Sequence, residues 1–506
     1  MCTRLPNICL LMAALVAGGL LPLAFEPYHY PFMAFVSPLL LLYLLRQSTG
    51  LKASLVGYLY GLGFFGHGVY WVYFSIHHFG GAPLWLAIGI MAGMVALLAL
   101  YMAAFAYLLT RFFKQKPIIR YLLAFPSLWV GLECLRSVLL TGFPWLLLGY
   151  SQIDAWASGL GAVVGVFGLS WFVTSMTGAF ALLLSRMPNK QTIWLVSFVI
   201  ISYLGVWPLK SQQWGEPAGK PINVALLQGN IPQAIKWQRS YRQASIDAYW
   251  GMTKQQRDAD LIIWPETAIP AFYHEVNSTL LNSLRADIHQ QQGADIIVGL
   301  PVKHQENNEY FNALHSIRNE GEFYFKRHLV PLGEYMPLKP LSTFILKFLN
   351  IPFSDFSSGL DDQPLLSAAG HSFASSICYE DVFQQSSLDG LPKAAYLVNI
   401  SNDTWFGRTI APAQHLQMAR MRALESGRYL LRATNTGLTA IVGQRGQLIS
   451  QLPMFQRSYL TGSIVPLKGS TPFVQGGWWV IWVFTGLILV LSFINRDKRP
   501  ISSQAA

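Results

Sequence analysis

Long apolar stretches constrain this chain more than any other feature of its sequence. A helix needs about 20 apolar residues to cross the hydrocarbon core of a bilayer. Stretches near that length, the second shorter and the fourth longer, occupy 8–25, 31–45, 53–76, 83–110, 118–136, 158–185, 192–209 and 477–494. The first has only Arg4 as a basic flank and no small-residue cleavage site after it, so we interpret it as a span and not a secretory signal. The sequence therefore predicts a polytopic α-helical membrane domain of about eight spans.

Charge is distributed unevenly along the chain. The sequence contains 36 Lys and Arg and 25 Asp and Glu residues, and only 14 of these lie in residues 1–210. The segment 211–476 therefore has the composition of a water-soluble domain. We expect a transmembrane domain of seven spans at 1–210, a soluble domain at 211–476, an eighth span at 477–494 and a cytoplasmic tail at 495–506.

The connections between the expected spans differ in their basic residues. Connections 26–30 and 77–82, on one side of the membrane, contain neither Lys nor Arg. The other side receives Arg4, Arg46, Lys52, Arg111, Lys114, Lys116, Arg120, Arg186, Lys190, Arg496, Lys498 and Arg499. Because basic connections stay in the cytoplasm, we expect the segment 211–476 to be extracytoplasmic. The formal net charge of +11 is largely this topological signal, and no basic aromatic patch accompanies it, so we expect no nucleic-acid partner.

Beyond Lys210 the pattern changes to short strands separated by helices. We expect helices near 238–258, 275–291 and 412–426, and strands at 223–228, 260–264, 295–302, 313–319, 322–328, 372–378, 395–400, 429–433, 440–442 and 448–451. Strands that alternate with helices are typical of a layered α/β sandwich. The segment is long enough to bury the core of one large domain.

Cys378 ends one of these expected strands. Side chains alternate along 372–378, and Glu380 and Asp381 follow the cysteine at once. It is the one cysteine of the soluble domain, because Cys2, Cys9 and Cys134 lie in or beside spans. A single cysteine in an oxidising compartment is either a small buried core residue or a working thiol. The strand alone leaves both interpretations open.

Two other expected strands also end at chemically useful side chains. Pro265 turns the chain after an apolar strand and is followed by Glu266, while Lys326 ends another strand and precedes Glu334. A thiol is a poor nucleophile until a base removes its proton, and a cation stabilises both a thiolate and an oxyanion. Each residue alone could be an ordinary surface charge, but Glu266, Lys326 and Cys378 together predict covalent catalysis.

These motifs resemble those of a known superfamily. Trp264-Pro265-Glu266, the stretch from Lys326 to Glu334, and Ile377-Cys378-Tyr379-Glu380 resemble the Glu-Lys-Cys triad of the nitrilase superfamily, in the same order, over about 221–466. Further matching stretches are Gln228-Gly-Asn-Ile-Pro-Gln, Trp237, Thr141-Gly-Phe-Pro-Trp and Asn402-Asp-Thr-Trp-Phe-Gly. With eight spans, the whole chain resembles the membrane-embedded branch of that superfamily, the bacterial apolipoprotein N-acyltransferases.

The resemblance implies an αββα sandwich with assigned residue roles. Cys378 would be the nucleophile, Glu266 the general base, and Lys326 with the backbone N–H of Tyr379 the oxyanion stabilisers. Glu334 would orient Lys326 or assist proton transfer, and Tyr379 and Glu380 would support the site. Lipid-substrate handling is implied for the loop with Trp237. No metal and no organic cofactor is expected.

The resemblance also implies the substrates. Family members move an acyl chain from a phospholipid, preferentially phosphatidylethanolamine, to the α-amino group of the diacylglyceryl-modified N-terminal cysteine of an apolipoprotein. The soluble domain would then stand in the periplasm, on a multi-pass protein of the inner membrane. Two alternatives are a membrane-anchored nitrilase-type amidase, in which water takes the acyl group, and a transporter with a sensing outer domain. A transporter would need more ionisable residues within its spans than His67, Glu133 and Arg136.

Two features leave a structural and a functional interpretation open. Glu133 and Arg136 lie one helical turn apart, so they either pair with each other or serve the function. The apolar run 338–353 is either a core helix or a mobile arm that admits lipid to Cys378. On the functional interpretation, Arg136, Phe344 and Phe348 join Trp237 as candidate substrate-binding residues.

Overall fold

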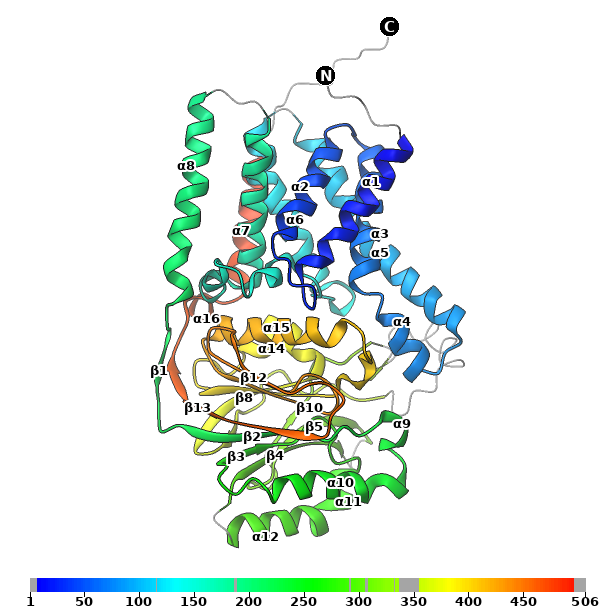
Figure 1. Cartoon of the computed structure of the whole chain (residues 1–506), viewed down its shortest axis with the longest axis vertical. Coiled ribbons are helices and arrows are strands. Elements are labelled where there is room, and N and C mark those ends of the chain that lie inside the picture. Colours follow the sequence, from blue (N-terminus) through cyan, green and yellow to red (C-terminus); the bar gives the residue numbers. More distant parts are fainter. Residues whose placement is uncertain are drawn as a thin grey trace. The chain divides into compact units, whose positions relative to one another are not determined.

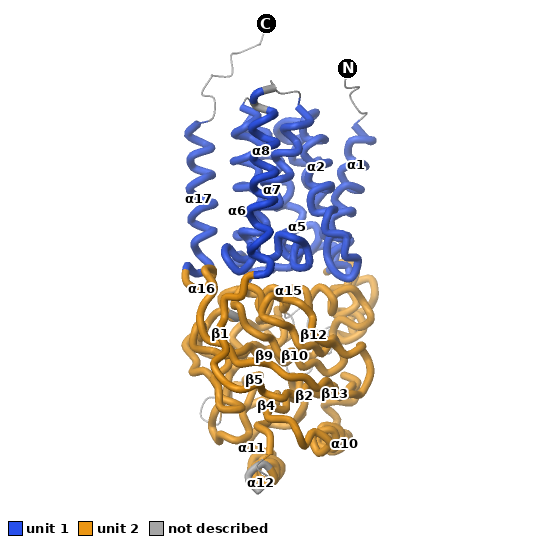
Figure 2. Tube along the Cα trace, turned by 60° about the vertical axis from the view of Figure 1, so that its left-hand side comes forward, with its two compact units in different colours: residues 1–70, 91–211, 476–506 blue, residues 71–90, 212–475 orange. Residues whose placement is uncertain are grey.

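The computed structural model describes residues 7–114, 116–185, 189–290, 293–304, 308–331, 333–335 and 355–495. The chain folds into two compact units, coloured separately in Figure 2. The helical unit comprises residues 1–70, 91–211 and 476–506, and the sandwich unit comprises residues 71–90 and 212–475. Each unit is therefore built from segments that are separated in the sequence.

The helical unit contains most of the apolar stretches. Its helices are α1 (Asn7–Leu20), α2 (Met33–Leu45), α3 (Leu51–Gly68), α5 (Leu84–Phe112), α6 (Phe125–Arg136), α7 (Gly161–Leu183), α8 (Asn189–Val206) and α17 (Trp479–Ile494) (Figure 1). The first turns of α5 are grouped in the sandwich unit. Within the described residues, four helical segments are long and apolar enough to cross a membrane: Asn7–Ala24, Leu84–Phe112, Ser158–Leu183 and Thr192–Lys210. The remaining expected spans form the helices α2, α3, α6 and α17, which are shorter or less apolar.

Glycines allow α1 and α3 to approach closely. A Cβ atom at Gly18 would collide with the backbone carbonyl of Tyr60, and one at Gly63 would collide with the carbonyl of Leu15. Without a hydrophobic drive between helices in lipid, small residues at the crossing supply the packing contacts. A larger residue at either glycine would force the two helices apart.

The segment that follows α3 joins the sandwich unit. The expected span 53–76 ends as a helix at Gly68, and α4 (Val72–Phe74) and the π-helical turn Ser75–Phe79 come after it. There the hydroxyl of Ser75 donates to the carbonyl of Trp405 at 2.7 Å. Trp71 packs edge-on against Phe406, with 4.9 Å between ring centroids. The apolar composition of 53–76 could not reveal that its last residues belong to the sandwich unit, because aromatic side chains are equally apolar whether lipid or protein surrounds them.

Two six-stranded sheets form the sandwich unit. The first has the order β13 (Ser458–Ile464), β2 (Ile222–Gln228), β3 (Leu261–Ile263), β4 (Asp295–Lys303), β5 (Tyr310–Ser316), β6 (Phe323–Phe325). The second has the order β12 (Leu448–Gln451), β11 (Ala440–Val442), β10 (Leu430–Thr434), β9 (Tyr396–Ser401), β8 (His371–Ile377), β7 (Leu366–Ala368). The central strands of each sheet pair in parallel, in the orders β2–β3–β4 and β8–β9–β10. Helices lie between these strands in the sequence, as the alternation predicted.

Alternation along the strands separates two apolar faces. In β2, Val224 and Leu226 face the core between the sheets, where they join residues such as Ile377, while Ala225 and Leu227 face outward. The outward face of the first sheet packs on α10 (Arg239–Thr253) and α12 (Asn282–Gln290), and α15 (Ala411–Ser426) covers the second sheet (Figure 1). The layers are thus helix, sheet, sheet, helix, which confirms the expected sandwich. All ten expected strands are present. Four others among the described residues were not anticipated: β7, β13, and the strands β1 (Gly215–Pro217) and β14 (Leu467–Gly469), which pair with each other in a separate two-stranded sheet.

Candidate active site

The ends of three strands carry the predicted triad. Lys326 directly follows β6, Glu266 lies three residues beyond β3, and Cys378 directly follows β8 of the other sheet. All three are buried, with exposed fractions of 1%, 6% and 8% in that order. The Lys326 ammonium lies 3.8 Å from the Glu266 carboxylate. The structure therefore brings together groups that are separated by up to 112 positions in the sequence.

Lys326 is held as a cation by two carboxylates. Its Nζ lies 2.8 Å from the carboxylate of Glu334, and its backbone N–H donates to the carbonyl of Asn312 at 2.9 Å. Burial alone would lower the pKa of Lys326, but Glu334, Glu266 and Cys378 raise it, and the net pKa lies above the ordinary value for lysine. The ammonium is thus a fixed positive charge beside the thiol.

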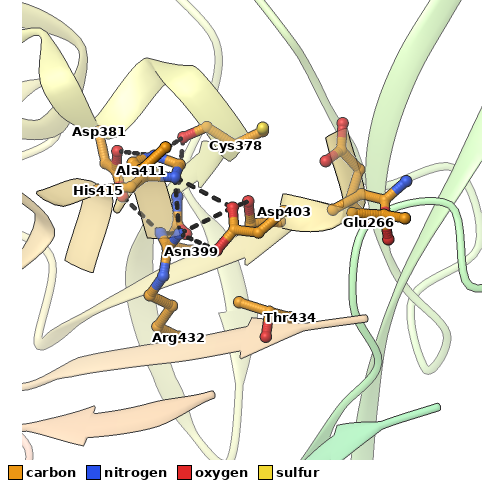
Figure 3. A network of polar contacts seen from close by, with 12 residues as sticks. Glu266, Cys378, Asp381, Asn399, Asp403, Ala411, His415, Arg432 and Thr434 are labelled. Carbon is orange, nitrogen blue, oxygen red and sulfur yellow. Dashed lines mark hydrogen bonds and ion pairs between the residues drawn. The ribbon is translucent and has the colours of Figure 1, made fainter. Parts of the chain in front are cut away.

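Glu266 has one engaged and one open oxygen. Its Oε1 accepts a hydrogen bond of 2.7 Å from the side-chain amide of Asn312, whereas its Oε2 is buried and has no partner among the described residues. The thiol of Cys378 points toward the side on which this carboxylate lies (Figure 3). The strand β4 comes so close to the turn that a Cβ at Gly299 would collide with the backbone of Pro265 and Glu266. Glu266 is therefore placed to accept a proton through its open oxygen.

Cys378 occupies a strained position in the backbone. Its φ angle is +52°, in the left-handed region, where the short helical turn Cys378–Val382 begins. A residue with a side chain adopts this conformation at a cost of about 1–2 kcal/mol, and such strain is typical of functional sites. Burial raises the pKa of the Cys378 thiol, and Glu266 and Asp403 raise it further against the lowering effect of Lys326. The resting thiol is therefore protonated and needs a base.

Glu380 ties the cysteine turn to the lysine strand. Its carboxylate accepts backbone hydrogen bonds from Ile377 at 2.7 Å, Arg327 at 2.6 Å and His328 at 3.1 Å, and the hydroxyl of Tyr324 donates to it at 3.0 Å. Burial raises the pKa of Glu380, while Lys326 and these N–H groups oppose the rise. Through these hydrogen bonds Glu380 positions the backbone on both sides of the site.

Asn312 is a site residue that the sequence did not indicate. Its amide donates both to Glu266, at 2.7 Å, and to Glu334, at 3.2 Å. An asparagine within a strand carries no local signal of such a role, because the role depends on the pairing of β5 with β6. Glu334 in turn accepts from the backbone N–H of Val330 at 2.8 Å.

Tyr379 and Trp237 lie at the edge of this group. Tyr379 is half-buried and its ring packs edge-on against Phe383, with centroids 5.2 Å apart. Trp237 is half-buried at the end of α9 (Gln233–Lys236). The preceding Lys236 is buried, and its ammonium donates to the carbonyl of Glu266 at 3.2 Å. Burial lowers the pKa of Lys236 to about 8 despite the nearby charge of Glu266.

The remaining predicted residues lie elsewhere. Arg136 belongs to the helical unit, where its guanidinium donates to the carbonyls of Phe143 at 2.7 Å and Trp145 at 2.5 Å. Glu133 accepts from the indole of Trp129 and from the backbone of Leu148 in the same unit. Both charges thus anchor the segment that follows α6. Phe344 and Phe348, with the run 338–353, lie outside the described residues, so their role stays a prediction.

Comparison with known proteins finds family matches in both parts of the chain. Residues 17–179 match the family model of the apolipoprotein N-acyltransferase N-terminal domain, and residues 223–468 match that of carbon-nitrogen hydrolase. The apolipoprotein N-acyltransferase of Methylococcus capsulatus is 44% identical over 496 residues, covering 98% of both chains. That of Coxiella burnetii is 40% identical over 482 residues, covering 95% of this chain and 99% of the relative. That of Pseudomonas aeruginosa is 39% identical over 497 residues, covering 97% and 96%. The chain belongs to the apolipoprotein N-acyltransferase family.

Proposed function

We propose that this acyltransferase carries the acyl group on the thiol of Cys378. It takes the group from a membrane phospholipid, with phosphatidylethanolamine as the preferred donor, and passes it to the α-amino group of the diacylglyceryl-modified N-terminal cysteine of an apolipoprotein. The observation that carries the proposal is the open, buried oxygen of Glu266 on the side toward which the Cys378 thiol points, with Lys326 as a fixed cation beside both.

In the first half-reaction the thiol attacks the ester of the donor. Oε2 of Glu266 takes the proton from Sγ of Cys378 as the new S–C bond forms at the ester carbonyl. Lys326 and the backbone N–H of Tyr379 stabilise the oxyanion. The intermediate then breaks its C–O bond, and Glu266 returns the proton to the leaving alcohol of the lysophospholipid. The product is a thioester on Cys378 with the site back in its starting charge state.

In the second half-reaction the neutral α-amine attacks the thioester carbonyl. Glu266 accepts a proton from the attacking nitrogen, the C–S bond breaks, and the thiolate is protonated again by Glu266. Lys326 stabilises the negative charge in both halves. The two substrates thus react in turn at one nucleophile, which is ping-pong kinetics.

The membrane arrangement follows from the helices and the basic connections. We propose eight spans: the four long apolar helices together with α2, α3, α6 and α17. The basic residues of the short connections support a cytoplasmic location for both termini and a periplasmic one for the sandwich unit. Labelling of single cysteines by a membrane-impermeant maleimide in whole spheroplasts tests this arrangement, with Lys468→Cys expected to react and Lys114→Cys expected not to react.

Mass spectrometry of the purified protein tests the mechanism. After incubation with phosphatidylethanolamine carrying deuterated acyl chains, the peptide containing Cys378 should gain the labelled acyl mass. Hydroxylamine should remove that mass, and so should a diacylglyceryl peptide, which becomes labelled. Cys378→Ala should abolish both signals with an unchanged melting temperature. Glu266→Gln and Lys326→Ala should prevent thioester formation itself.

Two outcomes would overturn the proposal. Labelled fatty acid released into water while the acceptor peptide stays unlabelled would indicate an amidase-type hydrolase. Transfer to the peptide at the wild-type rate by Cys378→Ala would exclude the thioester.

A further inference from the structure

Four charged side chains lie buried behind the cysteine turn. Asp381, Asp403, His415 and Arg432, here named the buried tetrad, are each no more than 1% exposed. They come from four different elements: the turn Cys378–Val382, the 3-10 turn Asp403–Phe406, α15 and β10 (Figure 3). Asp381 and Asp403 stand in stretches noted in the sequence, whereas His415 and Arg432 were not singled out, and none of the four has a role in the mechanism described above.

The tetrad forms a closed ring of ion pairs. His415 contacts Asp403 through Nδ1 at 3.1 Å and Asp381 through Nε2 at 2.8 Å. Arg432 contacts the other oxygen of each carboxylate, Asp381 at 2.8 Å and Asp403 at 3.1 Å. Each aspartate is thus shared by the imidazole and the guanidinium.

The aspartates of the tetrad influence the protonation of His415. Burial lowers the pKa of His415, but Asp381 and Asp403 raise it against the effect of Arg432, and the net pKa is raised. Burial raises the pKa of Asp403, yet Arg432 and His415 bring it well below the ordinary value. The two aspartates thus favour the protonated form of His415, while Arg432, whose Nη2 lies 2.9 Å from Nδ1 of His415, opposes it.

The tetrad reaches the nucleophile through its backbone. Nε2 of His415 lies 3.2 Å from the carbonyl oxygen of Cys378 and 2.8 Å from Oδ1 of Asp381, so one ring nitrogen contacts both acceptors. The amide of Asn399 stands 3.5 Å from the same carbonyl, and its oxygen accepts from Arg432. Since Asp381 lies in the same turn, the tetrad holds the strained Cys378 at two points.

Aromatic rings close the outer side of the imidazole. Phe406 packs edge-on against His415 with centroids 5.9 Å apart, and Trp71 packs edge-on against Phe406 at 4.9 Å. The segment after α3 therefore completes the wall that fixes the orientation of His415.

Stability alone gives no reason to bury these charges. Burying several ions has a large desolvation cost, and a well-packed apolar core is commonly as stable as a buried ion-pair network. An apolar core cannot supply a hydrogen-bond donor that points at the backbone carbonyl of Cys378, the residue in the left-handed region. We infer that His415 is a positioning residue, which holds the carbonyl of Cys378 and so aims the thiol and the following N–H of Tyr379 at the acyl carbonyl. This inference rests on the proposed role of Cys378 as nucleophile.

Two amide substitutions at His415 separate positioning from stability. Glutamine places its amide near the position of Nε2 and can still donate to Cys378. Asparagine places its amide near Nδ1, so it keeps the contact with Asp403 and loses the one with Cys378. His415→Gln should keep most of the rate of Cys378 acylation at saturating phosphatidylethanolamine, whereas His415→Asn should lose about 100-fold, the effect of a misplacement near 1 Å. KM for the donor should be unchanged in both, and melting temperatures should fall equally.

Equal acylation rates in the two variants would overturn the inference. Failure of the proposed function looks different, because the wild type itself would then form no thioester on Cys378. Should both His415 variants fail to fold, a second matched pair decides. Asp381→Asn and Asp295→Asn each neutralise a buried aspartate that pairs with an arginine, but Asp295 contacts Arg318 and the backbone N–H of Ala369. Slow acylation is expected for Asp381→Asn alone, and equal rates would contradict the inference.

Discussion

The ammonium of Lys326 lies 2.8 Å from the carboxylate of Glu334, closer than the 3.8 Å that separates it from Glu266. In the proposed mechanism, different carboxylates therefore anchor the cation and accept the proton. Glu334 would compensate the buried ammonium and leave Glu266 free to take the proton of Cys378. Asn312 donates to both carboxylates and fixes their spacing.

Replacing Glu334 by Gln should shift the alkaline limb of the pH–rate profile. Glu334 is the strongest of the charges that raise the pKa of Lys326, while burial lowers it. In the wild type the folded-state pKa is raised, so the proton stays bound across the whole working range. In Glu334→Gln the proton leaves at lower pH, and acylation of Cys378 should fall about 100-fold at pH 8 and less at pH 6. Stopped assays of thioester formation from pH 5 to 10 measure this. A parallel profile with uniformly lower rates would exclude the proposed coupling.

Cys378→Gly should be at least as stable as Cys378→Ala, against the usual order. Alanine at φ +52° keeps the cost of the left-handed region, about 1–2 kcal/mol, whereas glycine is free of it. Both variants should be inactive. Thermal unfolding in detergent provides the comparison, with Ser375→Gly and Ser375→Ala in the extended strand β8 as the control pair. At Ser375 the glycine variant should melt lower, and the same order at Cys378 would show that the turn is unstrained.

Asn312→Asp should weaken both stability and activity. The variant adds a third carboxylate between Glu266 and Glu334, and removes the amide that donates to both. We expect thioester formation to drop by about 100-fold and the melting temperature by several degrees at pH 8. Because the repulsion requires ionised carboxylates, the loss of melting temperature should shrink toward pH 5. Asn308→Asp, at an exposed position shortly before β5, serves as the control and should change neither quantity. A pH-independent loss would indicate missing hydrogen bonds without repulsion.

Lys236→Met should stabilise the protein in a pH-dependent way. Burial lowers the pKa of Lys236 to about 8, below its unfolded value of 10.5. Below pH 8 the lysine is charged in both states, so the folded protein bears the full cost of burying the charge. Between pH 8 and 10.5 the unfolded chain binds more protons than the folded one, and that cost disappears as pH rises. The melting temperature of Lys236→Met should therefore exceed that of the wild type most below pH 8, and the difference should vanish by about pH 10.5. A difference that is constant from pH 7 to 10.5 would contradict the lowered pKa.

Local patterns sufficed for the strands that present the triad. Alternation around 372–378 and the turn at Pro265 marked Cys378 and Glu266 as strand-end residues, and both lie where expected. Each of these signals lies within a few residues of the group it positions. The strands β7 and β13 escaped prediction because one has only three residues and the other contains glycine and two serines.

Groups that act across the fold gave no local signal. His415 lies on α15, where almost every side chain is buried, polar ones included, so the helix lacks the apolar stripe that normally orients it. Arg432 sits in a central strand, where a charge usually argues against burial. Their partners Asp381 and Asp403 are up to 51 residues away and meet them only through the order of strands in the second sheet. Pairing of this kind is a property of topology and not of sequence pattern.

The grouping of residues 71–90 with residues 212–475 makes the sandwich unit discontinuous along the gene. A coding segment for 212–475 alone would omit Trp71 and Ser75, which contact Phe406 and Trp405. Transfer of residues 212–475 alone to another protein would therefore lose these two contacts. During synthesis, the early piece must also wait on the ribosome for more than three hundred further residues before Trp405 and Phe406 emerge. Completion of the sandwich unit is in this way tied to the synthesis of the helices that lie between its two segments.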